Sequence, residues 1–265
     1  MGYILRHEFS LHIDPVLIPL FAKVSDRFFL CASKGVPTFT DFYDPAKWTA
    51  FSDALQRQRQ EVQVRVFGGM EDCERRMLGF FPLEEREISF PIARLRIRHN
   101  SKFNKTPRHQ DYLGSILGLG FDRGRIGDIF TDLQGEYGEV FVYEDIADYI
   151  CDQLEKIGRV PVKVQRVDNA EENLIKPQEV EEQLNVASLR LDAVVAAFFR
   201  LSRGQVSALI RAEKVFVNWS TCVDGGKQVK PGDMVTLRGY GRVRVGEVIG
   251  ATRKERLRLM VFRTK

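Results

Sequence analysis

The sequence predicts an α+β protein of 265 residues that is divided into three domains. Residues 1–83 combine a helical pattern with an alternating strand, which predicts an α/β domain. Residues 84–167 follow the order strand, helix, strand, strand, helix, strand. Residues 188–265 begin with two short amphipathic helices and continue as strands. Between them, residues 168–187 are rich in Asp and Glu, which predicts an acidic linker or an exposed helical connector.

In the N-terminal domain, one helix and one strand support the prediction. Asp44 before Pro45 is a typical helix start, because proline fits the first helical turn. Three large apolar side chains then fall on one helical face: Trp48, Phe51 and Leu55. The next segment alternates valines at positions 62, 64 and 66, as a half-buried strand does. We expect these elements to form the scaffold of the domain.

Six elements are expected in the central domain, and their order is that of a ferredoxin-like (RRM-like) fold. They are Ile92 to Arg98, Arg108 to Leu117, Gly127 to Leu133, Glu139 to Tyr143, Ile146 to Ile157 and Pro161 to Val167. In such a fold the two helices cover one face of a four-stranded sheet, so the composition of the other face matters for binding.

That other face is predicted to be basic and aromatic. In the first strand Leu95 and Ile97 alternate with three arginines, and in the strand over residues 139–143 two valines alternate with two aromatic residues. If the strands are adjacent, the arginines and the aromatic residues together form a platform on which RNA bases stack and phosphates bind. The resulting secondary RNA-binding candidates are Arg94, Arg96, Arg98, Phe141 and Tyr143. A solvated face, or a face covered by another domain, is the alternative.

Two neighbouring helices open the C-terminal domain. Apolar residues recur at i, i+3, i+4, i+7 and i+8 over residues 191–199. Ser202 and Gln205 match a capping box, which predicts that a new helix starts at Ser202. Arg203 and Arg211 lie on a stripe apart from the apolar residues of this second helix. The helix pair therefore displays arginines together.

The net charge of +4 is unevenly distributed. Residues 186–265 hold 16 Lys and Arg against 6 Asp and Glu, a net charge of +10, whereas residues 1–185 hold 24 against 30, a net charge of −6. A concentrated positive field attracts a phosphate backbone through the release of counterions. An acidic protein or an anionic membrane would also suit this field, so charge alone predicts an anionic partner.

Motifs for metal, nucleotide or catalytic chemistry are not found in the sequence. The four cysteines and four histidines are scattered, with no C-x-x-C pair. The glycines at positions 118, 120 and 124 follow a predicted helix, so they predict a turn and not a phosphate-binding loop. There is no G-x-S-x-G motif. We therefore expect no metal, no cofactor and no catalytic residue. Because no segment has the apolar length of a membrane span, we expect a cytoplasmic protein with no membrane partner.

Four short motifs follow one another in the C-terminal domain: Arg190-Leu191-Asp192, Ser202-Arg203, Lys214 to Asn218, and Gly232-Asp233. In order and spacing they resemble the S-four (S4, alpha-L type) RNA-binding module, which is named after a small-subunit ribosomal protein. Two residues depart from the pattern, because the module usually has glycine where Glu213 and Trp219 stand. The resemblance, together with the basic surface, implies contacts with structured RNA. The predicted RNA-binding residues are Arg190, Arg200, Ser202, Arg203, Gln205, Arg211, Lys214, Val215, Asn218, Lys227, Arg238, Arg242 and Arg244.

Four further stretches extend the resemblance over most of the chain: residues 39–45, 67–80, 109–120 and 123–129. They are similar to the YlmH family of bacterial proteins, which join such a central domain to a C-terminal S4 module. The resemblance implies a non-enzymatic, ribosome-associated protein that binds ribosomal RNA or transfer RNA on the large ribosomal subunit. It also implies a role in the rescue and quality control of stalled translation. We expect the protein to act as a monomer.

Two other classes of function stay open. An RNA-modifying enzyme would use the S4 module to deliver its substrate to residues 1–167, but it would need a cofactor loop or a catalytic dyad there. An interaction protein of the cell-division machinery would instead offer its basic C-terminal domain to an acidic protein. RNase treatment of a lysate separates RNA binding from protein binding.

Overall fold

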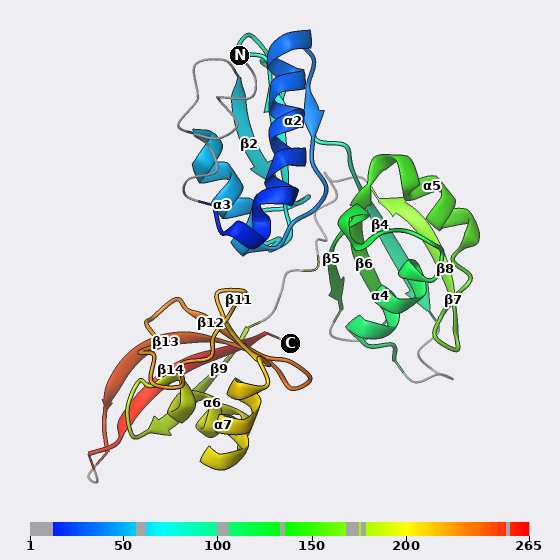
Figure 1. The fold of residues 1–265 in the computed structure, drawn as a ribbon. Helices are drawn as coiled ribbons and strands as arrows, with labels where there is room; N and C mark the ends of the chain where they lie inside the picture. Colours follow the sequence, from blue (N-terminus) through cyan, green and yellow to red (C-terminus); the bar gives the residue numbers. More distant parts are fainter. Residues whose placement is uncertain are drawn as a thin grey trace. The chain divides into compact units, whose positions relative to one another are not determined.

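In the computed structural model the chain forms two compact units, Met1–Lys176 and Pro177–Lys265. Figure 1 shows the course of the chain within each unit. The structure describes residues 13–56, 62–99, 106–132, 136–167, 175, 179–252 and 255–264. Half of the expected linker (168–174 and 176–178) and Leu133, at the end of an expected strand, lie outside the described residues. Each unit is described by itself below.

The N-terminal part of the first unit packs two helices against a three-stranded antiparallel sheet. Its elements are η1 (Pro15–Leu17), α2 (Ile18–Lys34), β1 (Thr38–Phe39), α3 (Pro45–Gln56), β2 (Gln63–Phe67) and β3 (Met77–Phe81), with the sheet order β1-β3-β2. Helix α3 starts at Pro45 as predicted, and Asp44 Oδ1 accepts a hydrogen bond from the Lys47 N–H at 3.1 Å. Phe51 and Leu55 are fully buried in the core with side chains of α2. The predicted α/β scaffold is therefore present.

The central part of this unit is a sheet with two helices on one face. Its elements are β4 (Ile92–His99), α4 (His109–Leu117), η2 (Arg123–Arg125), β5 (Ile126–Thr131), β6 (Tyr137–Tyr143), α5 (Glu144–Gln153), β7 (Lys156–Ile157) and β8 (Val160–Val167). The strand order β5-β6-β4-β8-β7, antiparallel throughout, contains the ferredoxin-like arrangement that the sequence predicts. The expected helix over residues 146–157 is wrong at its end: it stops at Gln153, because Lys156–Ile157 turn back as β7 through Gly158 at φ 60°.

Helices α4 and α5 bury the apolar face of this sheet. Leu95 and Ile97 of β4 and Val140 and Val142 of β6 share one core with the helices, as their alternation predicts. Strands β4 and β6 are neighbours, with Arg94 opposite Phe141 and Arg96 opposite Glu139. The arginines and aromatic residues therefore lie on the face without helices.

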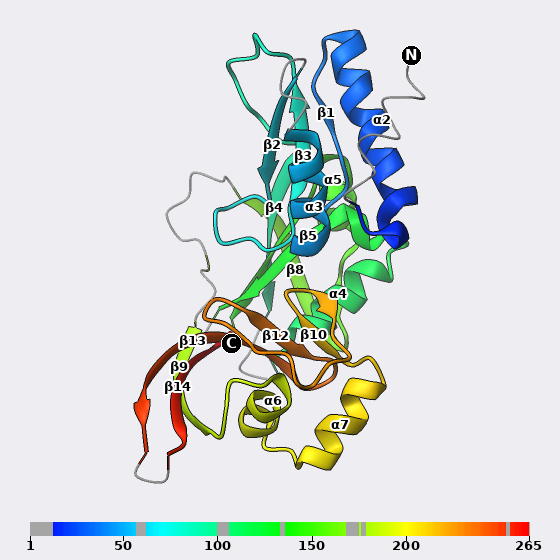
Figure 2. The same cartoon turned by 60° about the vertical axis from the view of Figure 1, so that its left-hand side comes forward.

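The second unit is a six-stranded sheet with two helices on one face. Its elements are β9 (Glu179–Val186), α6 (Leu191–Phe199), α7 (Arg203–Arg211), β10 (Val215–Val217), β11 (Ser220–Thr221), β12 (Met234–Leu237), β13 (Gly241–Ala251) and β14 (Leu257–Thr264), and the sheet order is β11-β10-β12-β13-β14-β9. Figures 1 and 2 both show α6 beside α7 along one face of the sheet. The two helices share a core with alternate residues of β10, β12, β13 and β14.

Strand β9 corrects the expectation of a linker over residues 168–187. Glu179–Val186 pair along their whole length with β14, so this acidic segment is an edge strand and not a tether. Val186 is buried and Leu184 packs against the same core, while Glu182 binds Arg263 of β14 with an Nε–Oε1 distance of 2.9 Å. The glutamates therefore complement basic side chains of the neighbouring strands.

The turn between the two helices follows the prediction. At the two positions that depart from the S4 pattern, the backbone adopts the positive φ values that glycine usually provides. Ser202 Oγ accepts a hydrogen bond from the Gln205 N–H at 3.3 Å, and Gln205 Oε1 accepts one from the Ser202 N–H at 2.9 Å, which confirms the capping box. Glu213 takes φ 56° after α7, where the module usually has glycine. Asn218 and Trp219 take φ 49° and 65° and form a two-residue turn between β10 and β11.

Candidate nucleic-acid interface

The first group of predicted RNA-binding side chains surrounds the start of α6 in the second unit. Arg190 is the N-cap residue, and its guanidinium binds the Asp192 carboxylate with N–O distances of 3.1 and 2.8 Å. The loop over residues 224–229 is tied to this point, because the Leu191 N–H donates to the Lys227 carbonyl at 2.8 Å. Arg203, at the start of α7, is close enough to act electrostatically on Asp192. Arg190, Arg203 and Lys227 therefore belong to one cluster, named the α6 entry cluster.

Asp192 keeps its charge in this cluster. The hydrogen bond from Arg190 is the main cause of a pKa that lies below the usual range of an aspartate, and the positive charge of Arg203 adds to the effect. A carboxylate in the first turn also suits the positive end of a helix. Since Asp192 neutralises part of the positive charge of Arg190, the exposed charge of this cluster comes mainly from Arg203 and Lys227.

A second group lies at the end of α6 and the start of β10, where Phe199 of α6 packs against Tyr240 in the turn that follows Arg238. Arg200 ends α6 in a left-handed conformation with φ 56°, which costs a non-glycine residue about 1 to 2 kcal/mol. The Arg238 N–H donates to the Lys214 carbonyl at 2.9 Å, so the strand β12 brings these two residues side by side. All three side chains are exposed. Arg200, Lys214 and Arg238 are named the α6 exit cluster.

Five further predicted residues lie elsewhere in the unit, and most of them make contacts within it. Val215 is wrong as a candidate, because its side chain is fully buried in the core below α6 and α7. The side-chain amide of Asn218 is used within the unit, since its Nδ2 donates to Asp233 Oδ1 and its Oδ1 accepts from the Met234 N–H, both at 2.8 Å. Ser202 and Gln205 cap α7, although both remain exposed. Arg211 is exposed in the last turn of α7.

The two arginines of β13 lie apart from the helices. Val243 and Val245 point into the core under α6 and α7, so Arg242 and Arg244, at alternate positions, occupy the opposite face of the sheet. The Arg244 guanidinium stacks on Phe262, with 4.1 Å from its Cζ to the ring centroid, and forms a bidentate ion pair with Glu179 of β9. The expectation that Arg244 extends a continuous basic surface with the helices is therefore wrong.

The expected platform on the central sheet is largely buried. Arg94 is 1% exposed and Phe141 is fully buried. Phe141 packs in a cluster with Phe42 and Met77 of the N-terminal part, which covers this half of the sheet. Gly69 permits the close approach, because a Cβ there would lie 2.2 Å from Phe141 Cδ1. The platform hypothesis is wrong for these residues, and the alternative of a face covered by another domain is right.

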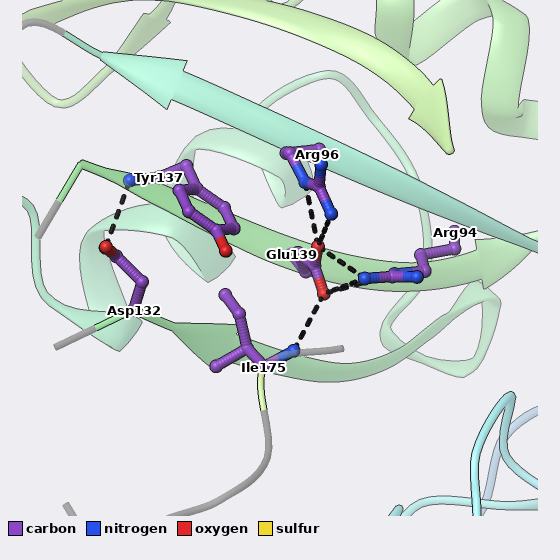
Figure 3. A network of polar contacts seen from close by, with 6 residues as sticks. All are labelled: Arg94, Arg96, Asp132, Tyr137, Glu139 and Ile175. Atoms are coloured by element: carbon purple, nitrogen blue, oxygen red, sulfur yellow. Dashed lines mark hydrogen bonds and ion pairs between the residues drawn. The ribbon is translucent and has the colours of Figure 1, made fainter. Parts of the chain in front are cut away.

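One carboxylate holds both buried arginines of this face, as Figure 3 shows. Arg94 reaches Glu139 with N–O distances of 2.7 to 3.1 Å, and Arg96 reaches Glu139 Oε1 at 2.8 to 2.9 Å. The backbone N–H of Ile175 lies 3.4 Å from Glu139 Oε2. Arg96, which is 7% exposed, also lies over the Tyr137 ring at 5.0 Å. The prediction that Arg94 and Arg96 bind RNA is therefore wrong, because both belong to an internal ionic network.

The remaining two candidates on this sheet, Tyr143 and Arg98, differ in exposure. Tyr143 is half-buried, and the Arg125 guanidinium lies over its ring at 3.5 Å, so its face is already occupied. Arg98 is exposed and lies over the ring of Tyr137, the first residue of β6, at 5.4 Å. Among the five described candidates on this sheet, Arg98 alone keeps the exposed basic character that the sequence predicts for the whole face.

In the part of the chain that the structure describes, no three His, Cys, Asp or Glu side chains are grouped so that they could hold a metal ion. Within the same residues, no single helix is long and apolar enough to cross a membrane, and only α6 and α7 taken together, bent by 116°, reach that length and composition.

Comparisons with known proteins identify two family domains in the chain. Residues 85–171 match the family described as a putative RNA-binding domain in YlmH, and residues 189–235 match the S4 domain. The chain is 31% identical over 229 residues to ribosome-associated protein quality control protein P2 of Bacillus subtilis (strain 168), which covers 85% of this chain and 87% of that protein. A solved structure, cell division protein ylmH from Streptococcus pneumoniae, has 21% identity and a TM-score of 0.51, and the match covers 61% of this chain and 96% of that chain. This last similarity concerns the fold alone.

Proposed function

Because the chain belongs to the YlmH family of RNA-binding proteins, we propose that it binds structured RNA of the large ribosomal subunit, either ribosomal RNA or transfer RNA. The B. subtilis relative is named for ribosome-associated protein quality control. By analogy, the present chain acts in the cytoplasm in the rescue of stalled translation. Its S4 unit supplies the main RNA contacts.

One observation carries this proposal: exposed positive charges without ion-pair partners lie around the helix pair. Among the described residues, no carboxylate oxygen lies within ion-pair distance of the side chains of Arg200, Arg203, Arg211, Lys214, Lys227 or Arg238. A phosphate can bind such a cation without breaking an internal pair, whereas Arg190 and Arg244 already hold carboxylates. Arg203 and Lys227 of the α6 entry cluster, the three residues of the α6 exit cluster and Arg211 are therefore the proposed phosphate contacts.

The proposal includes no catalytic step. Asp192 belongs to an Arg-Leu-Asp tripeptide, and the Arg190 hydrogen bonds keep its pKa low. A general acid or base works best with a pKa near the operating pH, so an aspartate held ionised at a helix start is poorly suited to proton transfer. Its place in the ion pair supports a role in positioning Arg190.

Replacing one cation from each cluster tests the proposal. The double variant Arg203→Ala/Lys214→Ala should bind deproteinised large-subunit ribosomal RNA more weakly than the natural protein. Each lost phosphate contact lowers the slope of log affinity against log salt by about 0.7 to 0.9, so the slope should flatten by about 1.4 to 1.8. The control Arg244→Ala/Arg263→Ala removes the same charge from arginines that are paired internally. Equal slopes in the two double variants would contradict the proposal.

The class of partner is tested in a lysate. The protein should sediment with ribosomes, and RNase digestion should release it. Unchanged complexes after digestion would instead indicate a protein partner and would favour the interaction-protein hypothesis.

A further inference from the structure

A tyrosine stands exposed in the turn between β12 and β13. The Tyr240 side chain is 54% exposed, whereas Tyr43 and Tyr112 of the first unit are buried. The Tyr240 N–H donates to the Leu237 carbonyl at 2.9 Å, which closes a tight turn. A tyrosine ring combines an apolar body with a polar tip, so a ring held in the open by an ordered turn is available to a partner.

Glycines on both sides keep the surroundings of this ring open. Gly239 and Gly241 have φ values of 89° and 126°, conformations that other residues rarely adopt. Apart from the glycine itself and its two neighbours in the chain, no heavy atom lies within 4 Å of the position that a Cβ would take at either glycine. The turn therefore combines a fixed backbone with free space beside the ring.

The ring is supported from α6. Phe199 packs against Tyr240 with ring centroids 6.2 Å apart and an angle of 73° between the rings. In an edge-to-face contact at least one face of the Tyr240 ring is left uncovered by Phe199. Phe199 in turn packs edge-to-face against Phe198 of the core at 4.8 Å. The Tyr240 ring is thus linked to the core through Phe199, yet it keeps a free face.

The α6 exit cluster lies at the same place. Arg200 directly follows Phe199, and Arg238 lies two residues before Tyr240 in the turn. The hydrogen bond from the Arg238 N–H to the Lys214 carbonyl brings the third cation of the cluster to the base of this turn. An aromatic face beside unpaired cations is the arrangement with which proteins bind single-stranded nucleotides.

We propose that Tyr240 stacks on an unpaired base of the bound RNA, while Arg200, Lys214 and Arg238 hold the adjacent phosphates. The inference rests on the proposed RNA binding and adds a base contact to it. The match to the S4 domain ends at residue 235, so this turn lies beyond the matched segment. The S4 unit would then recognise a place in folded RNA where a base is left unstacked.

Variants of Tyr240 test the stacking contact with deproteinised large-subunit ribosomal RNA as the probe. Tyr240→Ala should weaken binding on the order of tenfold, because stacking of one base contributes at about that level. Tyr240→Phe keeps the ring and should bind within about twofold of the natural protein. Tyr240→Leu keeps an apolar contact with Phe199 but offers no aromatic face, so it should bind like Tyr240→Ala. Tyr149→Ala, which removes a similarly exposed tyrosine from the first unit, is the matched control.

The salt slope separates this proposal from the wider one. Loss of stacking should leave the slope unchanged, whereas loss of Arg203 and Lys214 should flatten it. Natural affinity in Tyr240→Leu would overturn the base contact and leave RNA binding intact. Weak binding by Tyr240→Phe would also overturn it, because the hydroxyl and not the ring would then carry the contact. If Tyr240→Ala loses affinity for intact large subunits but not for their RNA, the ring contacts a protein. Failure of the natural protein to bind the RNA would overturn RNA binding itself.

Discussion

Glu139 binds Arg94 through both of its carboxylate oxygens on a face of the central sheet where neither side chain is more than 1% exposed. Arg96 binds the same carboxylate, so among the described residues Glu139 is shared by two buried arginines. An ionic group removed from water depends on its partner, because the desolvation that burial imposes is not otherwise offset.

The Glu139→Ala substitution should therefore lower the free energy of unfolding by about 3 to 5 kcal/mol, as the loss of one partner of a buried ion pair does. Chemical denaturation of the purified protein measures this. The control Arg166→Ala breaks an ion pair with Glu144 in which both side chains are more than 40% exposed, and it should cost less than about 1 kcal/mol. Similar losses in the two variants would contradict the internal role of Glu139.

Acid should weaken the attachment of β9 through Glu179. The hydrogen bond from Arg244 is the main cause that lowers the pKa of Glu179 below its ordinary 4.5. A carboxyl group whose pKa falls on folding stabilises the folded protein above its unfolded pKa, and this stabilisation is lost as the pH falls through the folded value. Thermal unfolding at pH 7 and pH 3 should therefore show a smaller acid-induced loss in Glu179→Gln than in the natural protein. Glu247→Gln, at an exposed position of β13, should behave like the natural protein, and an equal acid response in Glu179→Gln would speak against this ion pair.

Gly69 should be required for contact between the N-terminal and central parts of the first unit. Gly69→Ala places a methyl group against the Phe141 ring at a φ of 109° and should cost about 2 to 4 kcal/mol from backbone strain and overpacking. Gly158→Ala is a matched control, since that glycine has φ 60° and open space around it, and the loss there should be about 1 kcal/mol. Urea denaturation compares the two, and equal losses would mean that Phe141 yields to the methyl group.

Ser202 should act on stability and not on the salt dependence of RNA binding. Ser202→Ala removes the cap of α7 and should cost about 1 kcal/mol, whereas Ser207→Ala, on an exposed turn of the same helix, should cost less than about 0.5 kcal/mol. The slope of log affinity against log salt should not change, because the hydroxyl carries no charge. A lower affinity for the RNA with unchanged stability would instead assign the Ser202 hydroxyl to an RNA contact.

The sequence predicts the elements whose signals are local. The alternation in β4 and β6 predicts which side chains meet the helices, and the spacing of Ser202 and Gln205 predicts the start of α7. Whether the face of the central sheet opposite the helices is covered depends on residues distant in the sequence. Glu139 lies more than 40 residues from Arg94 and Arg96, and Phe42 and Met77 belong to the N-terminal part. Alternating arginines look alike on an open sheet and on a covered one, so the local pattern cannot separate the two.

In the candidate site, too, the sequence predicts the features that have local signals and misses those that depend on distant residues. Arg203 and Lys214 are found where the helical pattern and the S4 motif place them, but the opposite orientation of Arg244 follows from the register of β13. The sequence does not predict strand β9, because glutamates between Val180, Leu184 and Val186 are typical of a solvated connector. Its partners are arginines that come about 60 to 80 residues later in the chain.

The place of β9 at the border of the six-stranded sheet has a practical consequence for anyone who wishes to study the RNA-binding module alone. A fragment trimmed to start at residue 189, where the matched S4 segment begins, would lack the strand that pairs with all eight residues of β14. The bared backbone groups of β14 would invite pairing with a second copy of the fragment or with other extended chains. A fragment that begins ahead of Glu179 keeps this margin closed and is the one expected to stay monodisperse.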